Sequence, residues 1–270
     1  MKRIGLIFLA LLLLFCAGCS TKAPVAAKPE AVKTAPAKQE QKQVVQKTTT
    51  ELTLMKDTPY ATPAYVYKAS VEGPAVMVVG GVHGNEPAGS LAAQKFCDVD
   101  LLKGTLIVIP KANITALAAE VRTLPETGDL NRSYPGKKAG TPAEEITYEI
   151  VQLMQQYKVA MVLDLHEGYA FNTEEPKSVG ETILPGKDDI STILAIDAME
   201  HVNKQITDPK KKFSVLANPI AGSTAYYANT VLKVPAFTIE TSSRQPLEDR
   251  VKYSFTIASF LVASQGVIAQ

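Results

Sequence analysis

The chain has 270 residues, with 28 Lys and Arg against 27 Asp and Glu, so its formal net charge at pH 7 is +1. A nearly neutral chain has no excess of positive charge for a nucleic-acid backbone, which argues against nucleic-acid binding. Of its three cysteines, Cys97 stands alone beyond the amino-terminal segment, so no internal disulfide can form there. The folded part must depend on its own core or on a bound metal.

The amino-terminal segment has the pattern of an export signal. A positive start precedes an apolar run over residues 4–15, which ends in Cys16-Ala17-Gly18-Cys19. This run is shorter than the roughly 20 residues of a membrane-spanning helix. The small residues before Cys19 resemble a bacterial lipobox, whose cysteine is acylated, although Cys16 stands where that pattern usually has Leu. We expect residues 1–19 to be a lipoprotein signal peptide, with an ordinary cleaved signal as the alternative.

The next segment differs sharply in composition. Residues 20–50 are dominated by Ala, Pro, Lys, Gln and Thr. Such a stretch buries too little apolar surface to offset its ordering entropy, so it is predicted to be a disordered linker. Residues 51–270 have the size of one domain. The expected location is the periplasmic or other extracytoplasmic face of a bacterial membrane, through a lipid anchor at Cys19.

The domain alternates short apolar, β-branched runs with longer amphipathic segments. Predicted strands are Val76–Val79, Thr105–Ile109, Val159–Leu165 and Ala236–Ile239, with weaker ones at Tyr65–Ala69, Thr182–Leu184 and Phe213–Leu216. Predicted helices are Glu86–Phe96, Ala143–Gln156, Ile190–Gln205, Ser223–Val231 and Leu247–Ala263. Thr141-Pro142-Ala143-Glu144 has the pattern of a capping box with proline at N1. The alternation predicts an α/β fold with a central sheet covered by helices on both faces.

Ionisable side chains follow three of the clearest strands. His83 and Glu86 lie in a glycine-rich turn after the first, His166 ends another, and Glu240 follows the last. In α/β folds, ligands bind beyond the carboxyl ends of strands. The third histidine of the chain, His201, lies in mid-helix among polar residues and is assigned no role.

This pattern of residue types favours a zinc site. Zinc binds imidazole and carboxylate ligands in a tetrahedron, and a catalytic site keeps one position for water. The three-residue spacing of His83 and Glu86 lets both side chains reach one ion, and Gly81 and Gly84 permit a tight turn. His166, from another strand end, could complete the set.

Four motifs occur in a fixed order along the chain: Gly81-Val82-His83-Gly84-Asn85-Glu86, Asp129-Leu130-Asn131-Arg132, Asp164-Leu165-His166 and Thr238-Ile239-Glu240. Together they resemble the zinc carboxypeptidase superfamily, especially its succinylglutamate desuccinylase/aspartoacylase branch and the related bacterial murein-peptide amidases. The resemblance extends from about residue 75 to 241. It implies a mixed central β-sheet between helices and a catalytic domain over residues 51–270.

The resemblance also implies a role for each matched position. His83, Glu86 and His166 correspond to the ligands of one zinc ion, and Glu240 to the general base. The remaining matches are Arg122 to an arginine that stabilises the oxyanion, Asn131 and Arg132 to a pair that binds a substrate carboxylate, and Asp129 to a carboxylate that orients the first zinc histidine. Each role suits the chemistry of its side chain.

Several of these assignments have alternatives. Residues 128–136 could be only a polar surface loop, and Arg122 is a single residue at approximate spacing. Glu167 is the other candidate base, but strand alternation should turn it away from the metal. In related enzymes a Gly-Ser turn and an aromatic border the leaving-group pocket, which makes Ser223 and Tyr226 or Tyr227 candidates for substrate contact. Ser223 could equally be a helix N-cap.

The predicted function is a zinc-dependent metallocarboxypeptidase or peptide amidase, cleaving an amide next to a free carboxylate on cell-wall or other extracytoplasmic peptides. The alternative is a deacylase of N-acyl amino acids, which needs the same site. A lipoprotein that binds a ligand without turnover is disfavoured, because the three metal ligands and a base are all present. The substrate inference rests on location and family analogy.

Overall fold

The computed structural model describes residues 45–217 and 219–270. The expected signal peptide and lipidation site at Cys19 lie outside these residues, as does most of the expected linker. The first strand, β1 (Lys47–Leu54), begins before residue 51, so the folded part starts earlier than predicted. Within the described residues, no helix combines the length and apolar character needed to cross a membrane.

The described residues form one mixed sheet of eight strands in the order β1-β2-β4-β3-β5-β8-β6-β7. Its other strands are β2 (Thr62–Ala69), β3 (Ala75–Gly80), β4 (Thr105–Ile109), β5 (Met161–Gly168), β6 (Thr182–Pro185), β7 (Ser214–Val215) and β8 (Ala236–Ser242). The central strands β4, β3, β5 and β8 pair in parallel, whereas β1, β2 and β6 join by antiparallel pairing. The parallel strands therefore present their carboxyl ends along one edge of the sheet.

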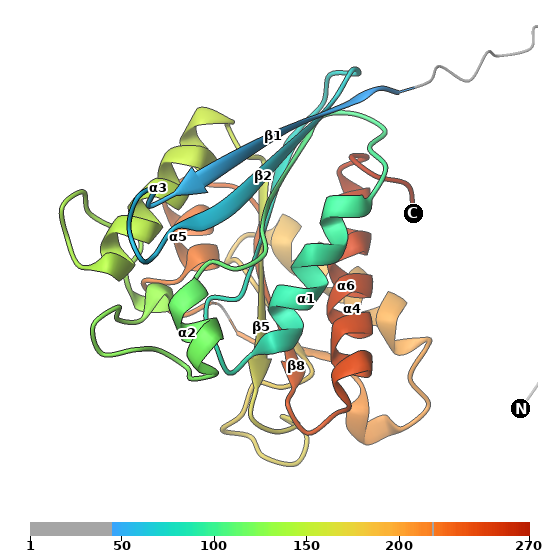
Figure 1. Ribbon diagram of the computed structural model, residues 1–270. Coiled ribbons are helices and arrows are strands. Elements are labelled where there is room, and N and C mark those ends of the chain that lie inside the picture. The colour runs from blue at the N-terminus through green and yellow to red at the C-terminus, as the bar shows by residue number, and fades with distance from the viewer. Residues whose placement is uncertain (1–44, 218) are drawn as a thin grey trace, which may run out of the picture. The chain divides into compact units, whose positions relative to one another are not determined.

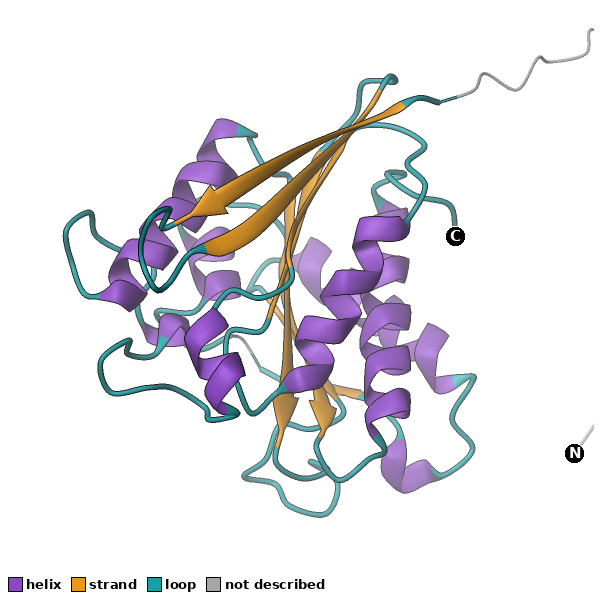
Figure 2. Cartoon of the chain, in the orientation of Figure 1, coloured by secondary structure: helices purple, strands orange, loops and turns teal. Residues whose placement is uncertain are grey.

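Helices cover both faces of the sheet, as the alternating pattern predicts (Figures 1 and 2). One face carries α1 (Pro87–Lys95), α4 (Asp189–Asn203) and α6 (Leu247–Ser264). The other carries α3 (Pro142–Gln156) and α5 (Thr224–Thr230), with the short α2 (Ile114–Ala119) on the same side in Figure 1. The fold class is thus α/β with a mixed central sheet.

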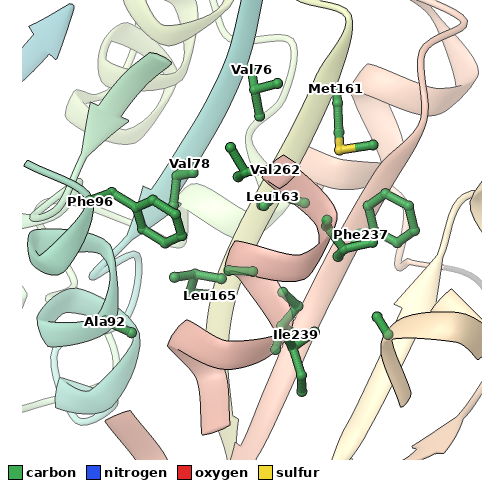
Figure 3. Close-up of a cluster of buried hydrophobic side chains, with 14 of the residues drawn as sticks. Val76, Val78, Ala92, Phe96, Met161, Leu163, Leu165, Phe237, Ile239 and Val262 are labelled. Atoms are coloured by element: carbon green, nitrogen blue, oxygen red, sulfur yellow. The ribbon is translucent and has the colours of Figure 1, made fainter. Parts of the chain in front are cut away.

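The alternation of side chains along the strands divides the core into two layers. Leu163, Leu165, Phe237 and Ile239 pack against α1, α4 and α6, and Figure 3 shows this cluster. Val162 and Ala236, which directly precede these two pairs, belong to the cluster beneath α3 and α5. The same alternation determines which face each polar side chain near the strand ends will reach.

The predicted elements recur with shifted ends. β4 and the start of α6 fall where predicted, and α3 has the predicted capping box, with Thr141 and Glu144 bonding each other's backbone N–H. β5 starts two residues later than predicted and continues through His166 to Gly168, while β8 continues through Glu240 to Ser242. His166 and Glu240 therefore lie within regular strands, which hold their side chains in defined directions.

Among the strands and α-helices of the described residues, β1 and α2 were not predicted. β1 is an edge strand whose residues are almost all exposed, so its Thr-rich sequence lacks an apolar alternation. α2 has six residues, too few for a helical period to be recognised, and it is capped by the Asn113 side chain, which accepts from Ala116 N. β1 takes its structure from pairing with β2, and α2 from its side-chain cap, rather than from a local sequence pattern.

Candidate metal centre and active site

Three side chains converge on one point at the carboxyl edge of the sheet. His83 lies in the turn after β3, Glu86 just before α1, and His166 near the end of β5. The Nδ1 atoms of the two histidines are 3.2 Å apart, and Glu86 places one carboxylate oxygen 2.8 Å from each of them. All three residues are buried. The strands β3 and β5 are neighbours, so their ends bring together residues 83 positions apart.

This arrangement fits a bound metal ion. At zinc–ligand distances of about 2.0–2.1 Å, tetrahedral ligand atoms stand about 3.3 Å from one another. The three atoms here lie within 4.8 Å of one another, and they come from two imidazoles and one carboxylate, a donor set typical of zinc. Burial alone would disfavour a charged Glu86, but the two histidines outweigh it and lower the pKa of this carboxyl group. Glu86 is therefore an anion aimed at the point that both imidazole nitrogens face.

Glycines make the turn that holds His83 and Glu86 possible. Gly81 has a φ of +67°, in the left-handed region that favours glycine. Gly84 has a different reason: a Cβ there would lie 1.8 Å from the backbone oxygen of Ala116 in α2. The turn can therefore close against α2 only because residue 84 has no side chain.

Each metal histidine has a carboxylate behind it. Asp129 Oδ1 lies 3.3 Å from His83 Nε2, as the resemblance implies. Burial favours the neutral acid at Asp129, but the hydrogen bond from His83, the Asn131 N–H and the charge of Arg122 lower its pKa to about 2. An ionised carboxylate on Nε2 leaves Nδ1 of His83 free to bind a metal.

The second carboxylate, Asp164, was not assigned a role from the sequence. Its Oδ1 lies 3.1 Å from His166 Nε2, close enough for an ion pair, although the angle does not meet hydrogen-bond geometry. Asp164 is fully buried. The available signal was alternation, because Asp164 and His166 are two apart on one strand and must share a face.

Glu240 stands on the same face of the sheet as His166. The two residues are paired in the register of β5 and β8. Burial raises the pKa of Glu240 to about 8, because water is excluded around it, and the negative charges of Glu86 and Asp164 add to the effect. A divalent cation held by the three ligands acts in the opposite direction. Glu240 is thus a buried carboxyl group that pairs with His166 in the sheet and lines the same cavity as the candidate metal ligands.

Glu167, the other candidate base, points away. Its Oε1 accepts a hydrogen bond of 2.6 Å from Ala88 N in α1, and its Oε2 pairs with Arg250 Nη1 in α6. Both partners lie on the opposite face of the sheet from His166. The prediction from strand alternation therefore describes the position of Glu167 correctly.

The three polar residues matched to substrate contact line the same cavity as the metal ligands. Arg122 Nη1 lies 3.2 Å from Glu86 Oε1, and Nη2 lies 3.6 Å from Asp129 Oδ2. Asn131 is buried, and its Oδ1 has no hydrogen-bond partner among the described residues. Arg132 is exposed, and its Nη1 donates to the Asn131 backbone oxygen at 2.8 Å. Residues 130–132 form a short 3₁₀ turn, not an open loop.

The aromatic residue that borders the cavity is not the predicted one. Ser223 lines the cavity and also caps α5, since its side chain accepts from Tyr226 N at 3.1 Å, so both of its proposed roles are compatible. Tyr226 does not line the cavity, and Tyr227 stacks on Tyr134 in the core. Both tyrosines lie in α5, whose first turn directs their side chains away from the cavity. Tyr169, which follows β5 and is 58% exposed, borders the cavity instead.

The cavity has a volume of about 600 Å³. Its charged lining includes the metal cluster, Glu240, Arg122 and Arg132, and its apolar wall includes Leu184, Val179, Pro219 and Ile220. Three side chains that can bind a metal, a buried carboxyl group and two guanidinium groups in one concave site are an arrangement typical of metallohydrolases.

Comparisons with known proteins agree with this class. Residues 72–251 match the succinylglutamate desuccinylase/aspartoacylase catalytic domain, so the chain belongs to this family. The buried cluster of His83, Glu86 and His166 agrees with a single metal ion, as is typical of this family. Over 101 residues the chain is 37% identical to the N-alpha-acetyl-L-2,4-diaminobutyric acid deacetylase of Halomonas elongata, a match that covers 36% of this chain and 29% of that protein.

Solved structures share the fold. The D,L-carboxypeptidase Csd4 of Helicobacter pylori in its mDAP-bound form has a TM-score of 0.66 at 23% identity, covering 72% of this chain and 51% of that one. A succinylglutamate desuccinylase/aspartoacylase from Rhodobacter sphaeroides has a TM-score of 0.61 at 18% identity, covering 84% of this chain and 66% of that one. The matched part of this chain thus corresponds to about half the length of Csd4.

Replacing His166 by Ala is expected to remove the metal. The variant loses one of three ligands, and the remaining two cannot hold the ion against a chelator. Metal analysis of the purified protein should fall from about one ion per chain to background. His201→Ala, at an exposed histidine of α4, is the matched control and should keep its metal. Full occupancy in His166→Ala would overturn the ligand set.

Proposed function

We propose that the chain is a zinc-dependent deacylase, which hydrolyses the amide bond of an N-acylated amino acid that has a free carboxylate. The observation that carries this proposal is one cavity lined by the metal cluster, Glu240 and the pair Asn131–Arg132. Membership of the desuccinylase/aspartoacylase family and the similarity to a deacetylase of an acetylated amino acid support it. These observations favour a deacylase over the carboxypeptidase that the motifs first suggested.

The residues of the site divide the reaction between them. His83, Glu86 and His166 would hold the zinc ion, which supplies a Lewis acid for the scissile carbonyl and lowers the pKa of water. The Glu240 carboxylate accepts a proton from the attacking water and returns it to the leaving amine nitrogen. Arg122, whose guanidinium reaches the cluster through Glu86, stabilises the developing oxyanion.

Asn131 and Arg132 orient the substrate. A planar guanidinium suits bidentate binding of a carboxylate, and the Nδ2 group of Asn131 can donate to the same carboxylate. The unpartnered Asn131 Oδ1 can accept a hydrogen bond from an N–H group of the substrate. Because Arg132 lies at the exposed side of the cavity, it would hold the carboxylate of the amino acid while the acyl group lies nearer the metal.

A second candidate is a carboxypeptidase acting on a short peptide with a free carboxyl terminus, including cell-wall peptides. The size of the cavity favours it, because about 600 Å³ exceeds the room that an acetylated amino acid needs. The fold of Csd4, described as a D,L-carboxypeptidase in its mDAP-bound form, supports the same reading. Both candidates use the same carboxylate-binding pair.

We further propose that the chain is a lipoprotein, acylated at Cys19 and held at the outer face of a bacterial membrane. The support is the Cys16-Ala17-Gly18-Cys19 motif after a positive start and an apolar run. In a bacterial host, Cys19→Ser should shift the protein from the detergent phase to the aqueous phase on phase partitioning. Wild-type protein in the aqueous phase would contradict the anchor.

Replacing Glu240 by Gln should abolish turnover while leaving the metal in place. An amide has nearly the shape of a carboxylate but cannot accept the proton from water. General-base catalysis contributes about 10²–10⁴-fold, so kcat should fall by that factor with metal content unchanged. Full activity in Glu240→Gln with its metal in place would exclude Glu240 as the base.

The substrate class can be tested with matched acids and amides. Wild-type protein should hydrolyse N-acetyl amino acids faster than the same compounds with an amidated carboxylate, by about tenfold to a hundredfold for one charge-assisted contact. Arg132→Ala should hydrolyse both at similar low rates. Arg244→Ala, which removes an exposed arginine paired with Glu174, is the control and should keep the preference.

Tripeptides with a free carboxyl terminus complete the panel. Faster turnover of tripeptides than of N-acetyl amino acids would replace the deacylase with the carboxypeptidase. Equal rates on acid and amide in wild-type protein would exclude the carboxylate-binding role of Arg132 and favour cleavage within longer chains.

A further inference from the structure

The helix that carries a metal ligand lacks a cap of its own. Glu86 occupies the N-cap position of α1, but it makes no capping hydrogen bond, because its carboxylate faces the two histidines. The first backbone N–H groups of a helix need other partners. Glu167 provides one, since its Oε1 accepts a hydrogen bond of 2.6 Å from Ala88 N. The cap of α1 is thus supplied by β5.

Glu167 also contacts the metal ligand itself. Its backbone N–H donates to Glu86 Oε2 over 3.1 Å. The residue directly after His166 therefore contacts the start of α1 at two points, one through its side chain and one through its backbone. These contacts join the strand that bears His166 to the segment that bears Glu86.

Arg250 holds the Glu167 carboxylate in place. It lies in the first turn of α6, its side chain is 14% exposed, and its Nη1 donates to Glu167 Oε2, whose side chain is 1% exposed. A buried carboxylate without a partner is costly, so Arg250 stabilises Glu167 in this position. Figure 1 shows α1 and α6 adjacent on this face of the sheet. The ion pair thus joins three elements: β5, α1 and α6.

A close contact of the backbone seats α1 against the same strand. A Cβ at Gly89 would lie 2.2 Å from the backbone oxygen of Leu165, so this residue must lack a side chain for α1 to approach β5. Leu165 directly precedes His166. The helix therefore approaches the strand closely next to His166, where Glu167 makes its contacts.

We propose that the Glu167–Arg250 pair positions the metal centre, by fixing the start of α1, and with it Glu86, relative to β5 and His166. Neither residue is a candidate ligand, and the Glu167 carboxylate is bonded to Ala88 and Arg250 rather than to the metal cluster. Metal–ligand distances in well-formed sites fall within about 0.2 Å of their usual values, so a loosened helix start should weaken binding even with all three ligands present. The inference rests on the proposed zinc site.

The test is the zinc affinity of the full chain, prepared metal-free and titrated against a chromophoric chelator. Glu167→Ala removes both the cap and the ion pair, and should weaken zinc binding by about tenfold to a hundredfold, the range for groups that orient ligands. Arg250→Met should weaken it less. Glu167→Gln with Arg250→Met should restore affinity towards wild type, because an amide oxygen can still accept from Ala88 N and no buried charge is left unpaired.

Thermal unfolding of the metal-free variants separates positioning from general loosening. Ile257→Val, two turns further along α6 and fully buried, is the control: it should lower the melting temperature and leave zinc affinity unchanged. Wild-type affinity in Glu167→Ala would overturn the inference. So would losses of affinity that follow melting temperature in every variant, Ile257→Val included. Failure of the wild-type chain to bind zinc would instead defeat the proposed function.

Discussion

The convergence of His83, Glu86 and His166 is the constraint on which the rest of the site depends. Two imidazole nitrogens 3.2 Å apart share one buried carboxylate, and this places three ligand atoms in a space the size of one ion. Such a group is stable only if a cation or protons occupy it, because unpaired buried charges are costly. Asp129 and Asp164 face the far nitrogens of the two histidines, so both imidazoles present Nδ1 to the centre.

The fold meets this constraint through parallel strands and close helix packing. β3 and β5 are neighbouring parallel strands, so their carboxyl ends bring together His83 and His166, which are far apart in the sequence. The β5–β8 register then adds Glu240. Gly84 and Gly89 have no side chain, which allows the turn before α1 to approach α2 and allows α1 to approach β5. The precision of the site thus comes from backbone packing on both sides of the sheet.

Alternation along β5 separates two functions in adjacent residues. His166 faces the cavity with Asp164 behind it, while Glu167 faces the helices and caps α1. In the sequence, the position of Glu167 next to His166 makes it a candidate base. Because side chains alternate along a strand, Glu167 instead points to the opposite face and bonds to α1. Arg250, remote in sequence, makes that position stable by neutralising the buried charge.

The sequence by itself determined the α/β class and seven of the eight strands of the described residues, and it picked out the buried cluster of His83, Glu86 and His166, since apolar period and strand-end chemistry are local properties. The roles of Glu240, Asp129 and the pair Asn131–Arg132 come from the ordered motifs and stay predictions. Only the tertiary structure decided that Tyr169 rather than Tyr226 borders the cavity, that Asp164 stands behind His166, and that Thr-rich β1 is a strand. These depend on helix rotation, side-chain direction and pairing with a distant partner, which are set by contacts between segments that no local pattern records.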